Sequence, residues 1–203
     1  MLTCDSLTLI KNNKTIFKDL SFALSTSSTL VITGGNGSGK TSLLKIIAGI
    51  IKPQAGKILW GDFAVTQIAD DFYGDMQFIG HQNFLKSQLS VKENIEFYAK
   101  LSDTQMAMSS ALSFFDLNEI AEEKVKNLSA GVQQRVRLSL LLACPATLWL
   151  LDEPSNNLDQ FYKEKLHGLI KTRIKEQGMV LLVTHDSLFF DLGLKINIED
   201  FKK

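Results

Sequence analysis

The chain has 203 residues, 45% of them hydrophobic, and its 22 lysines and arginines balance its 22 aspartates and glutamates. This composition excludes a disordered, collagen-like or low-complexity chain and predicts a single globular domain covering residues 1–203. Zero net charge disfavours a nucleic-acid binder, which usually presents a basic face, and cysteines without zinc-ligand spacing are typical of a reducing cytosol.

In the first part of the chain, apolar residues follow strand and then helix periodicities. Alternating apolar residues before position 25 predict short half-buried strands, with a turn at Asn12 and Asn13. The continuous apolar run at 30–33 predicts a central strand covered on both faces. A helix is predicted at 41–51, because apolar residues cover most of its helical wheel and Pro53 follows it.

After the first helix we predict two strands, a helical insert and then a return to alternating helices and strands. Strands are predicted at 57–60 and 77–79, with turns and short irregular structure between them at 61–74. From about 85 to 127, apolar residues recur at helical spacing without a strand signal, which predicts a helical subdomain inserted in the fold. Beyond it we expect a helix at 131–144, a strand at 148–151, a helix at 160–177 and a strand at 179–183.

No segment predicts a membrane span. The most apolar stretch, residues 138–151, is shorter than the roughly 18 residues that a spanning helix needs. The N-terminal sequence MLTCDSLTLI lacks the basic start and long apolar run of an export signal. We therefore expect any membrane attachment to come through a protein partner and not through direct lipid insertion.

A glycine-rich loop lies between the strand at 30–33 and the helix that follows it. Its sequence fits G-x4-G-K-[ST] and comprises Gly34, Gly35, Asn36, Gly37, Ser38, Gly39, Lys40 and Thr41. The glycines let backbone N–H groups close around phosphate oxygens, and the helix N-terminus adds partial positive charge. Lys40 is expected to reach the outer phosphates and the Thr41 hydroxyl to hold Mg²⁺. The alternative, a glycine-rich turn that only caps a helix, fits this combination less well.

Two further segments have the chemistry that such a loop needs. Asp152 and Glu153 end the apolar strand at 148–151; Asp152 suits Mg²⁺ coordination through water, and Glu153 suits a general base that polarises water. Ser129 can cap the next predicted helix and Gly131 permits close backbone approach, so this helix N-terminus is a second anion site. Taken alone, the acidic pair is more often a solvated turn and the serine a plain helix cap.

With these motifs in this order, the chain resembles the nucleotide-binding subunit of an ATP-binding cassette (ABC) transporter over essentially its whole length. Residues 128–132 correspond to the signature motif, Gln82 to the glutamine loop, residues 155–159 to the D-loop and His185 to the switch histidine. The resemblance implies an α/β fold of the P-loop NTPase type, the ABC ATPase fold. This fold has a central, mostly parallel sheet, an N-terminal antiparallel β subdomain and a helical insert.

The resemblance also implies ATP and Mg²⁺ as cofactors and assigns roles to individual residues. Lys40, Glu153 and His185 are implied to be catalytic, with His185 contacting the γ-phosphate and holding the water near Glu153. Thr41, Gln82 and Asp152 are implied to hold or sense Mg²⁺, and Gln82 links the nucleotide site to the helical insert, which docks a membrane subunit.

In such proteins two subunits pair head to tail, so that the signature of each covers the ATP held by the other. Ser129 and Gly131 are thus implied to complete the site in trans, and Asp159 of the D-loop to lie among the nucleotide-contacting residues. The implied assembly is a homodimer of ATP-binding subunits with integral-membrane subunits, on the cytoplasmic side of the inner membrane, without nucleic acid.

Several stretches indicate which subfamily of ABC ATPases the chain resembles. Residues 78–82, 89–98 and 146–154 are similar to the ATP-binding subunit of the heme exporter of cytochrome c maturation, which implies a role in heme delivery for c-type cytochromes. An ABC transporter ATPase for another substrate is the alternative. A soluble cassette ATPase acting on nucleic acid or ribosomes fits less well, since the chain has neither a second cassette nor a basic charge. A small-molecule P-loop kinase would leave residues 128–132 without a role.

The chain departs from the family's pattern at two positions. Family members usually carry an aromatic residue near Lys11 that stacks on adenine, and the nearest aromatic here is Phe17. Val132 replaces the usual glutamine of the signature, which removes a polar side chain from the site completed in trans.

Overall fold

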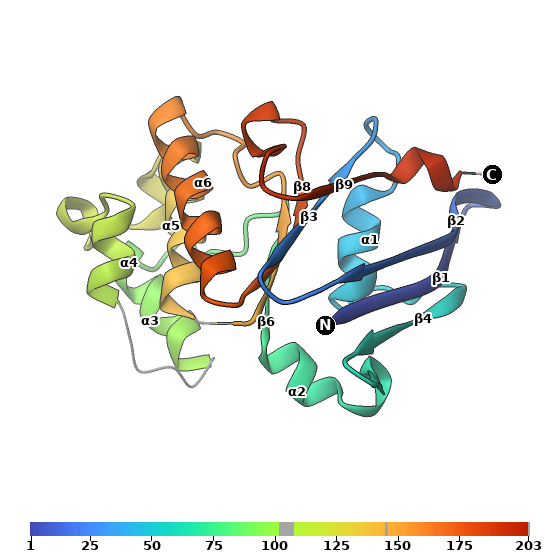
Figure 1. Cartoon of the computed structure of the whole chain (residues 1–203). Coiled ribbons are helices and arrows are strands. Elements are labelled where there is room, and N and C mark those ends of the chain that lie inside the picture. Colours follow the sequence, from blue (N-terminus) through green and yellow to red (C-terminus); the bar gives the residue numbers. More distant parts are fainter. Residues whose placement is uncertain (102–107, 145, 203) are drawn as a thin grey trace.

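The computed structural model describes residues 1–101, 108–144 and 146–202 and contains two sheets (Figure 1). The parallel sheet runs, in spatial order, through Met76–Ile79 (β6), Leu148–Asp152 (β7), Met179–Val183 (β8), Ser28–Thr33 (β3) and Leu194–Asn197 (β9). The antiparallel sheet runs through Lys14–Leu24 (β2), Leu2–Lys11 (β1), Ala55–Trp60 (β4) and Phe63–Ala64 (β5). The predicted strands at 30–33, 57–60, 77–79, 148–151 and 179–183 are therefore confirmed.

The hairpin between β1 and β2 turns at Asn12 and Asn13, as expected. Their φ angles of 49° and 58° are both positive, which matches the two-residue turn that best fits the twist of paired strands. Asparagine tolerates this conformation better than most residues. The two asparagines thus determine the position of the turn between β1 and β2.

The central strand β7 packs against different layers with its two faces. Leu148 and Leu150 belong to the hydrophobic cluster that also contains Leu43 and Leu44 of helix α1 (Lys40–Ile47) and the inner face of the antiparallel sheet. Trp149 and Leu151 belong to the cluster formed with helices α5 (Ala130–Ala143) and α6 (Gln160–Lys175). Figure 1 shows α1 on one side of the parallel sheet and α5 and α6 on the other. Because both faces are covered, the strand is apolar from Leu148 to Leu151.

Helix α1 is shorter than the predicted helix at 41–51. It ends at Ile47, and Gly49 follows with a φ of 70°. The N–H of Ile50 donates to Lys45 O over 2.9 Å and the N–H of Gly49 donates to Ile46 O over 3.0 Å, which is the Schellman arrangement of a glycine-terminated helix. The prediction placed the end at Ile51, before Pro53, and missed this earlier stop.

Two strands and one helix were not predicted. The segment at 61–74 contains β5 and the short helix α2 (Ala69–Gly74), so it is more regular than expected. The edge strand β9 pairs with β3 although Leu194 is 75% exposed. Its residues are mostly exposed, so it lacks the apolar pattern that reveals a buried strand.

Between β6 and α5, the described residues form two α-helices joined to the rest of the fold by loops and short 3-10 turns. Helix α3 covers Val91–Leu101 and helix α4 covers Met108–Phe114, and both pack against α5. Residues 102–107, which belong to the subdomain predicted at 85–127, lie outside the described residues. Across the described parts of the chain, no helix has the length and apolar character needed to cross a membrane.

Candidate functional site

A pocket of about 550 Å³ lies at the carboxyl ends of β3, β7 and β8, where open α/β sheets bind ligands. We call it the P-loop pocket. The glycine-rich loop follows β3, Asp152 and Glu153 end β7, and His185 follows β8. Its lining consists of Lys11, Ile16, Asn36, Gly37, Ser38, Gly39, Lys40, Thr41, Ser42, His81, Asp152, Glu153, Asn156, Val183 and His185.

The glycine-rich loop has a backbone that only glycines adopt without strain. Gly34, Gly37 and Gly39 have φ angles of 140°, 74° and 108°. A Cβ on Gly39 would also collide with the Ile16 side chain. Gly39 caps α1 without any side-chain hydrogen bond, so the first N–H groups of the helix remain available to an anion.

Lys40 is buried, with 7% of its surface exposed, and lies across the loop. Its Nζ donates to Gly34 O over 2.6 Å and to Gly35 O over 2.9 Å. These contacts hold the ammonium group beside the loop amides, where a phosphate chain would meet it. The position suits the role expected of Lys40, which is to neutralise outer phosphates.

Thr41 and Asp152 form the part of the pocket that suits a metal ion. Thr41 Oγ1 donates to Asp152 Oδ1 over 3.2 Å, whereas Asp152 Oδ2 is buried and has no hydrogen-bond partner among the described residues. Burial raises the pKa of the Asp152 carboxyl, and the hydrogen bond from Thr41 opposes this rise.

A buried carboxylate oxygen without a donor fits Mg²⁺, which takes few protein ligands and relies on phosphates and water for the rest. No group of three or more histidines, cysteines or acids that could hold a metal ion occurs in the described residues.

Glu153 and His185 meet at the rim of the same pocket. His185 Nε2 lies 3.4 Å from Glu153 Oε1, and the backbone N–H of His185 donates to Glu153 Oε2 over 3.3 Å. Burial raises the pKa of Glu153, while the neighbouring His185 lowers it. A carboxylate with a raised pKa beside a phosphate-binding loop can accept a proton from water. The structure thus brings together Lys40, Thr41, Asp152, Glu153 and His185.

The predicted second anion site forms a separate pocket of about 150 Å³ at the start of α5, the α5 pocket. Its lining includes Ser129, Gly131 and Asp159 but no residue of the P-loop pocket. Ser129 Oγ accepts from Val132 N over 3.4 Å, and Asp159 Oδ1 caps α6 by accepting from Tyr162 N over 3.0 Å. A Cβ on Gly131 would lie 2.7 Å from Asn157 O, so this close approach requires glycine.

Comparison with known proteins identifies the family. The family described as "ABC transporter" matches residues 17–156. The chain belongs to the ABC transporter family. It is 37% identical over 187 residues to "Cytochrome c biogenesis ATP-binding export protein CcmA" of Wolbachia pipientis wMel, covering 92% of this chain and 90% of that protein. The protein of the same name from Escherichia coli K12 is 36% identical over 188 residues, covering 93% and 90%.

Solved structures confirm the predicted ABC ATPase fold. A putative ABC transporter ATP-binding protein from Pyrococcus furiosus superposes with a TM-score of 0.85 at 23% identity, covering 100% of this chain and 99% of that one. A dimeric ATP-binding cassette in a post-hydrolysis state with ADP and Pi superposes with a TM-score of 0.86 at 24% identity, covering 97% and 94%. As an ABC cassette, the chain is an ATP-hydrolysing subunit.

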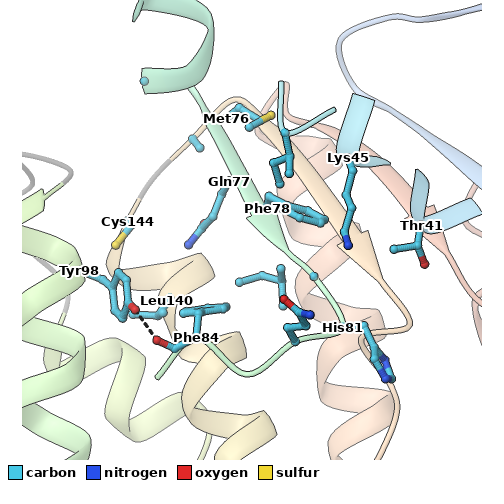
Figure 2. A pocket seen from close by; sticks show the side chains of 16 residues that line it. Thr41, Lys45, Met76, Gln77, Phe78, His81, Phe84, Tyr98, Leu140 and Cys144 are labelled. Atoms are coloured by element: carbon cyan, nitrogen blue, oxygen red, sulfur yellow. Dashed lines mark hydrogen bonds between the residues drawn. The ribbon is translucent and has the colours of Figure 1, made fainter. Parts of the chain in front are cut away.

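In this cassette, Gln82 does not line the P-loop pocket. It lines a neighbouring cavity of about 480 Å³, which also contains Lys45, Phe78, Phe84 and Tyr98 and which we call the β6 cavity (Figure 2). The residue before it, His81, lines both spaces. His81 was not predicted as a site residue, because its position next to Gln82 is its only distinguishing feature in the sequence.

Phe17 does not reach the nucleotide site of the cassette. Its side chain is fully buried in the core beneath Gly39, whereas Ile16 and Lys11 line the P-loop pocket. Lys11 Nζ donates to Ser42 Oγ over 3.0 Å. Strand alternation explains the difference, because successive side chains of β2 point to opposite faces of the sheet. Phe17, the aromatic residue nearest to Lys11, therefore lies outside the pocket, and Ile16 occupies the pocket wall.

Proposed function

We propose that this cassette is the ATP-hydrolysing subunit of a membrane transport complex that acts in heme delivery for cytochrome c biogenesis. The observation that carries the ATPase part is the pairing of Glu153 with His185 beside the glycine-rich loop. The cytochrome c part is supported by relatives whose printed names contain that process and which match about nine-tenths of both chains. The subunit would lie peripherally on the cytoplasmic side of the inner membrane.

The pocket chemistry supports hydrolysis by in-line attack of water on the γ-phosphorus. Glu153 would accept a proton from the attacking water, the bond between the γ-phosphorus and the bridging oxygen would break, and ADP and phosphate would leave. Lys40 and the α1 amides would hold the phosphate chain, and His185 would hold water and γ-phosphate near Glu153. Mg²⁺ bound by Thr41 and Asp152 would neutralise the developing phosphate charge.

The separation of the two pockets within one chain supports a dimeric site. The α5 pocket has an exposed helix N-terminus but no catalytic carboxylate pair, and the P-loop pocket has those groups but no signature residue. A two-fold, head-to-tail pairing would place Ser129 and Gly131 of each copy on the nucleotide bound by the other. Each dimer would thereby contain two complete ATP sites.

The β6 cavity is the position at which we propose that a membrane subunit contacts the cassette. Figure 2 shows Phe78, Phe84, Tyr98, Leu140 and Met76 around it. Ile50 also lines the cavity although 57% of its surface is exposed. An apolar segment of a membrane subunit seated here would lie against the Gln82 loop. Motion of that segment would then reach the P-loop pocket through His81, which lines both spaces.

Purification from native membranes tests this proposal. We expect the tagged chain to be recovered with integral-membrane proteins, and the purified complex to hydrolyse ATP and to show a heme absorption band. Ile50→Asp should reduce recovery of the membrane proteins. Leu194→Asp should not, because it changes an exposed apolar residue of β9, at the opposite edge of the parallel sheet from β6. Recovery with ribosomes in place of membrane proteins would overturn the transport role, and absence of heme would overturn the cytochrome c role alone.

A further inference from the structure

Two polar side chains of α5 are buried inside the protein, one helical turn apart. Gln134 is 4% exposed and Arg137 is 8% exposed, and their spacing places them on the same helix face. Arg137 Nη1 donates to Gln134 Oε1 over 2.7 Å, and Gln134 Nε2 donates to Pro154 O over 2.8 Å. The other terminal nitrogen, Arg137 Nη2, donates to Gly80 O. Three hydrogen bonds therefore connect Gly80 to Pro154 through α5.

The ends of this connection lie beside groups that the proposed reaction uses. Gly80 directly follows β6 and leads into Gln82, and Pro154 directly follows Glu153. The guanidinium carbon of Arg137 also lies 5.4 Å from the centre of the Phe84 ring, which is labelled in Figure 2. Arg137 thus contacts the segment 80–84 on both sides of Gln82.

Stability alone is a poor explanation for a guanidinium in this position. Arg137 Nε is buried and has no hydrogen-bond partner among the described residues. Burial lowers the pKa of Arg137, and the negative charge of Asp152 opposes that effect. Apolar side chains of similar volume commonly stabilise a fold as well as a buried charge does, or better. The contacts of Arg137 with Gly80 and Phe84 offer a better reason for its presence.

We propose that Arg137 is a positioning residue that holds the Gln82 loop, residues 80–84, in a fixed position relative to the Asp152–Glu153 turn. It acts through Gln82 and does not touch the nucleotide. The inference rests on the proposed ATPase function, because Gln82 and the acidic turn matter to the same reaction. Gln133 of the same helix adds a contact, since its Oε1 accepts from Asn83 Nδ2 over 2.6 Å.

The test compares Arg137→Met with Arg173→Met. Arg173 is a matched control outside the site: its Nη2 donates to Ala146 O, its Nε is buried without a partner among the described residues, and its guanidinium carbon lies 5.6 Å from the Trp149 ring centre. A 1 Å displacement of a reacting group can cost on the order of a hundredfold, so we expect Arg137→Met to lower kcat roughly ten- to hundredfold. ATP affinity should stay within about twofold, and Arg173→Met should leave kcat within about twofold of the unmodified chain.

Two readouts separate positioning from a general loss of structure. Hydrogen exchange of the amides at 80–84 should become faster in Arg137→Met and stay unchanged in Arg173→Met. In a Gln82→Ala background, adding Arg137→Met should change kcat by less than about twofold, because both substitutions remove the same function. Arg137→Lys, which keeps the charge but cannot reach both partners at once, provides a second variant if Arg137→Met does not fold.

The outcomes distinguish this inference from the proposed function. An inactive unmodified chain, assembled with its partners, would overturn the ATPase proposal itself. Full activity of Arg137→Met or Arg137→Lys in an active enzyme would overturn only the role of Arg137. The role of Arg137 would also be overturned if two results occurred together. The effects of Arg137→Met and Gln82→Ala on kcat would multiply independently, and amide hydrogen exchange at 80–84 would not change in Arg137→Met.

Discussion

Glu153 and His185 follow the adjacent parallel strands β7 and β8 and contact each other twice, through the imidazole at 3.4 Å and through the His185 backbone N–H at 3.3 Å. Glu153 adopts a φ of 49°, in the left-handed region that side chains other than glycine rarely occupy. Such a conformation costs on the order of 1 kcal/mol or more and persists where the surrounding structure imposes it. The N–H of Glu153 donates to Val183 O over 2.8 Å, which holds the residue there.

Glu153→Gln should lower kcat for ATP hydrolysis by roughly 10²- to 10⁴-fold, because an amide cannot accept the proton of the attacking water. ATP binding should persist, since glutamine has nearly the same shape, and ATP should then trap the dimer. The checks are steady-state hydrolysis and size-exclusion chromatography with ATP. Glu164→Gln is the control, because Glu164 is exposed on α6 and lines neither the P-loop pocket nor the α5 pocket. An unchanged rate in Glu153→Gln would refute its role as base.

Lys40→Ala should weaken ATP binding, because it removes the ammonium group held beside the loop carbonyls of Gly34 and Gly35. Ser129→Arg should instead abolish hydrolysis and leave ATP binding to the isolated subunit nearly intact, since Ser129 lies outside the P-loop pocket. Mixing the two variants should restore some activity, because a mixed dimer contains one site with neither substitution. Hydrolysis by the mixture, measured against each variant alone, tests whether the site is shared; no recovery would contradict it.

Ile16→Tyr should tighten ATP binding several-fold. Ile16 lines the P-loop pocket, so an aromatic ring at this position could stack on the base, and such stacking is worth about 0.5–1.5 kcal/mol beyond its buried area. Titration with a fluorescent ATP analogue measures the effect. Phe22→Tyr, which adds a hydroxyl to an aromatic side chain of the same strand away from the pocket, should have no effect on affinity. Weaker binding by Ile16→Tyr would show that the base lies elsewhere.

Asp186→Asn should lower stability more at neutral pH than in acid. Asp186 Oδ2 lies 2.8 Å from Lys163 Nζ, and the hydrogen bond from Lys163 is the main reason why the pKa of Asp186 is below its ordinary 3.8. A lowered folded-state pKa contributes stability above the unfolded-state pKa and loses it as pH falls through the folded-state value.

The loss should be no more than about 1 kcal/mol, because the pair is partly solvated, and asparagine retains the oxygen that accepts from Leu188 N. Urea unfolding of both proteins near about pH 6 and about pH 3 measures it, and the difference should become smaller at the lower pH. A difference that is equal at both pH values would exclude the ion pair as its cause.

Local patterns predicted the parallel sheet and the glycine-rich loop well, because their signals lie within a few residues. The apolar run at 30–33 and the loop that follows it are each recognised from consecutive residues. The predicted end of α1 was wrong, because Gly49 lies inside an apolar pattern that continues to Ile51. The pattern did not reveal the stop, which depends on the backbone conformation at Gly49. The edge strand β9 was missed because its pairing with β3 joins residues far apart in the chain.

By itself, the sequence determined which residues have the chemistry: the phosphate loop, the acidic pair, the serine at the start of α5 and the histidine after β8. These are short motifs whose backbone and side-chain requirements are local. Only the tertiary structure decided which of them share a pocket. It brought Glu153 to His185, separated Ser129 from Lys40, directed Ile16 rather than Phe17 at the nucleotide site, and buried Arg137 against the Gln82 loop. Strand order, strand register and helix packing set those relationships, and they depend on contacts between segments that no local pattern describes.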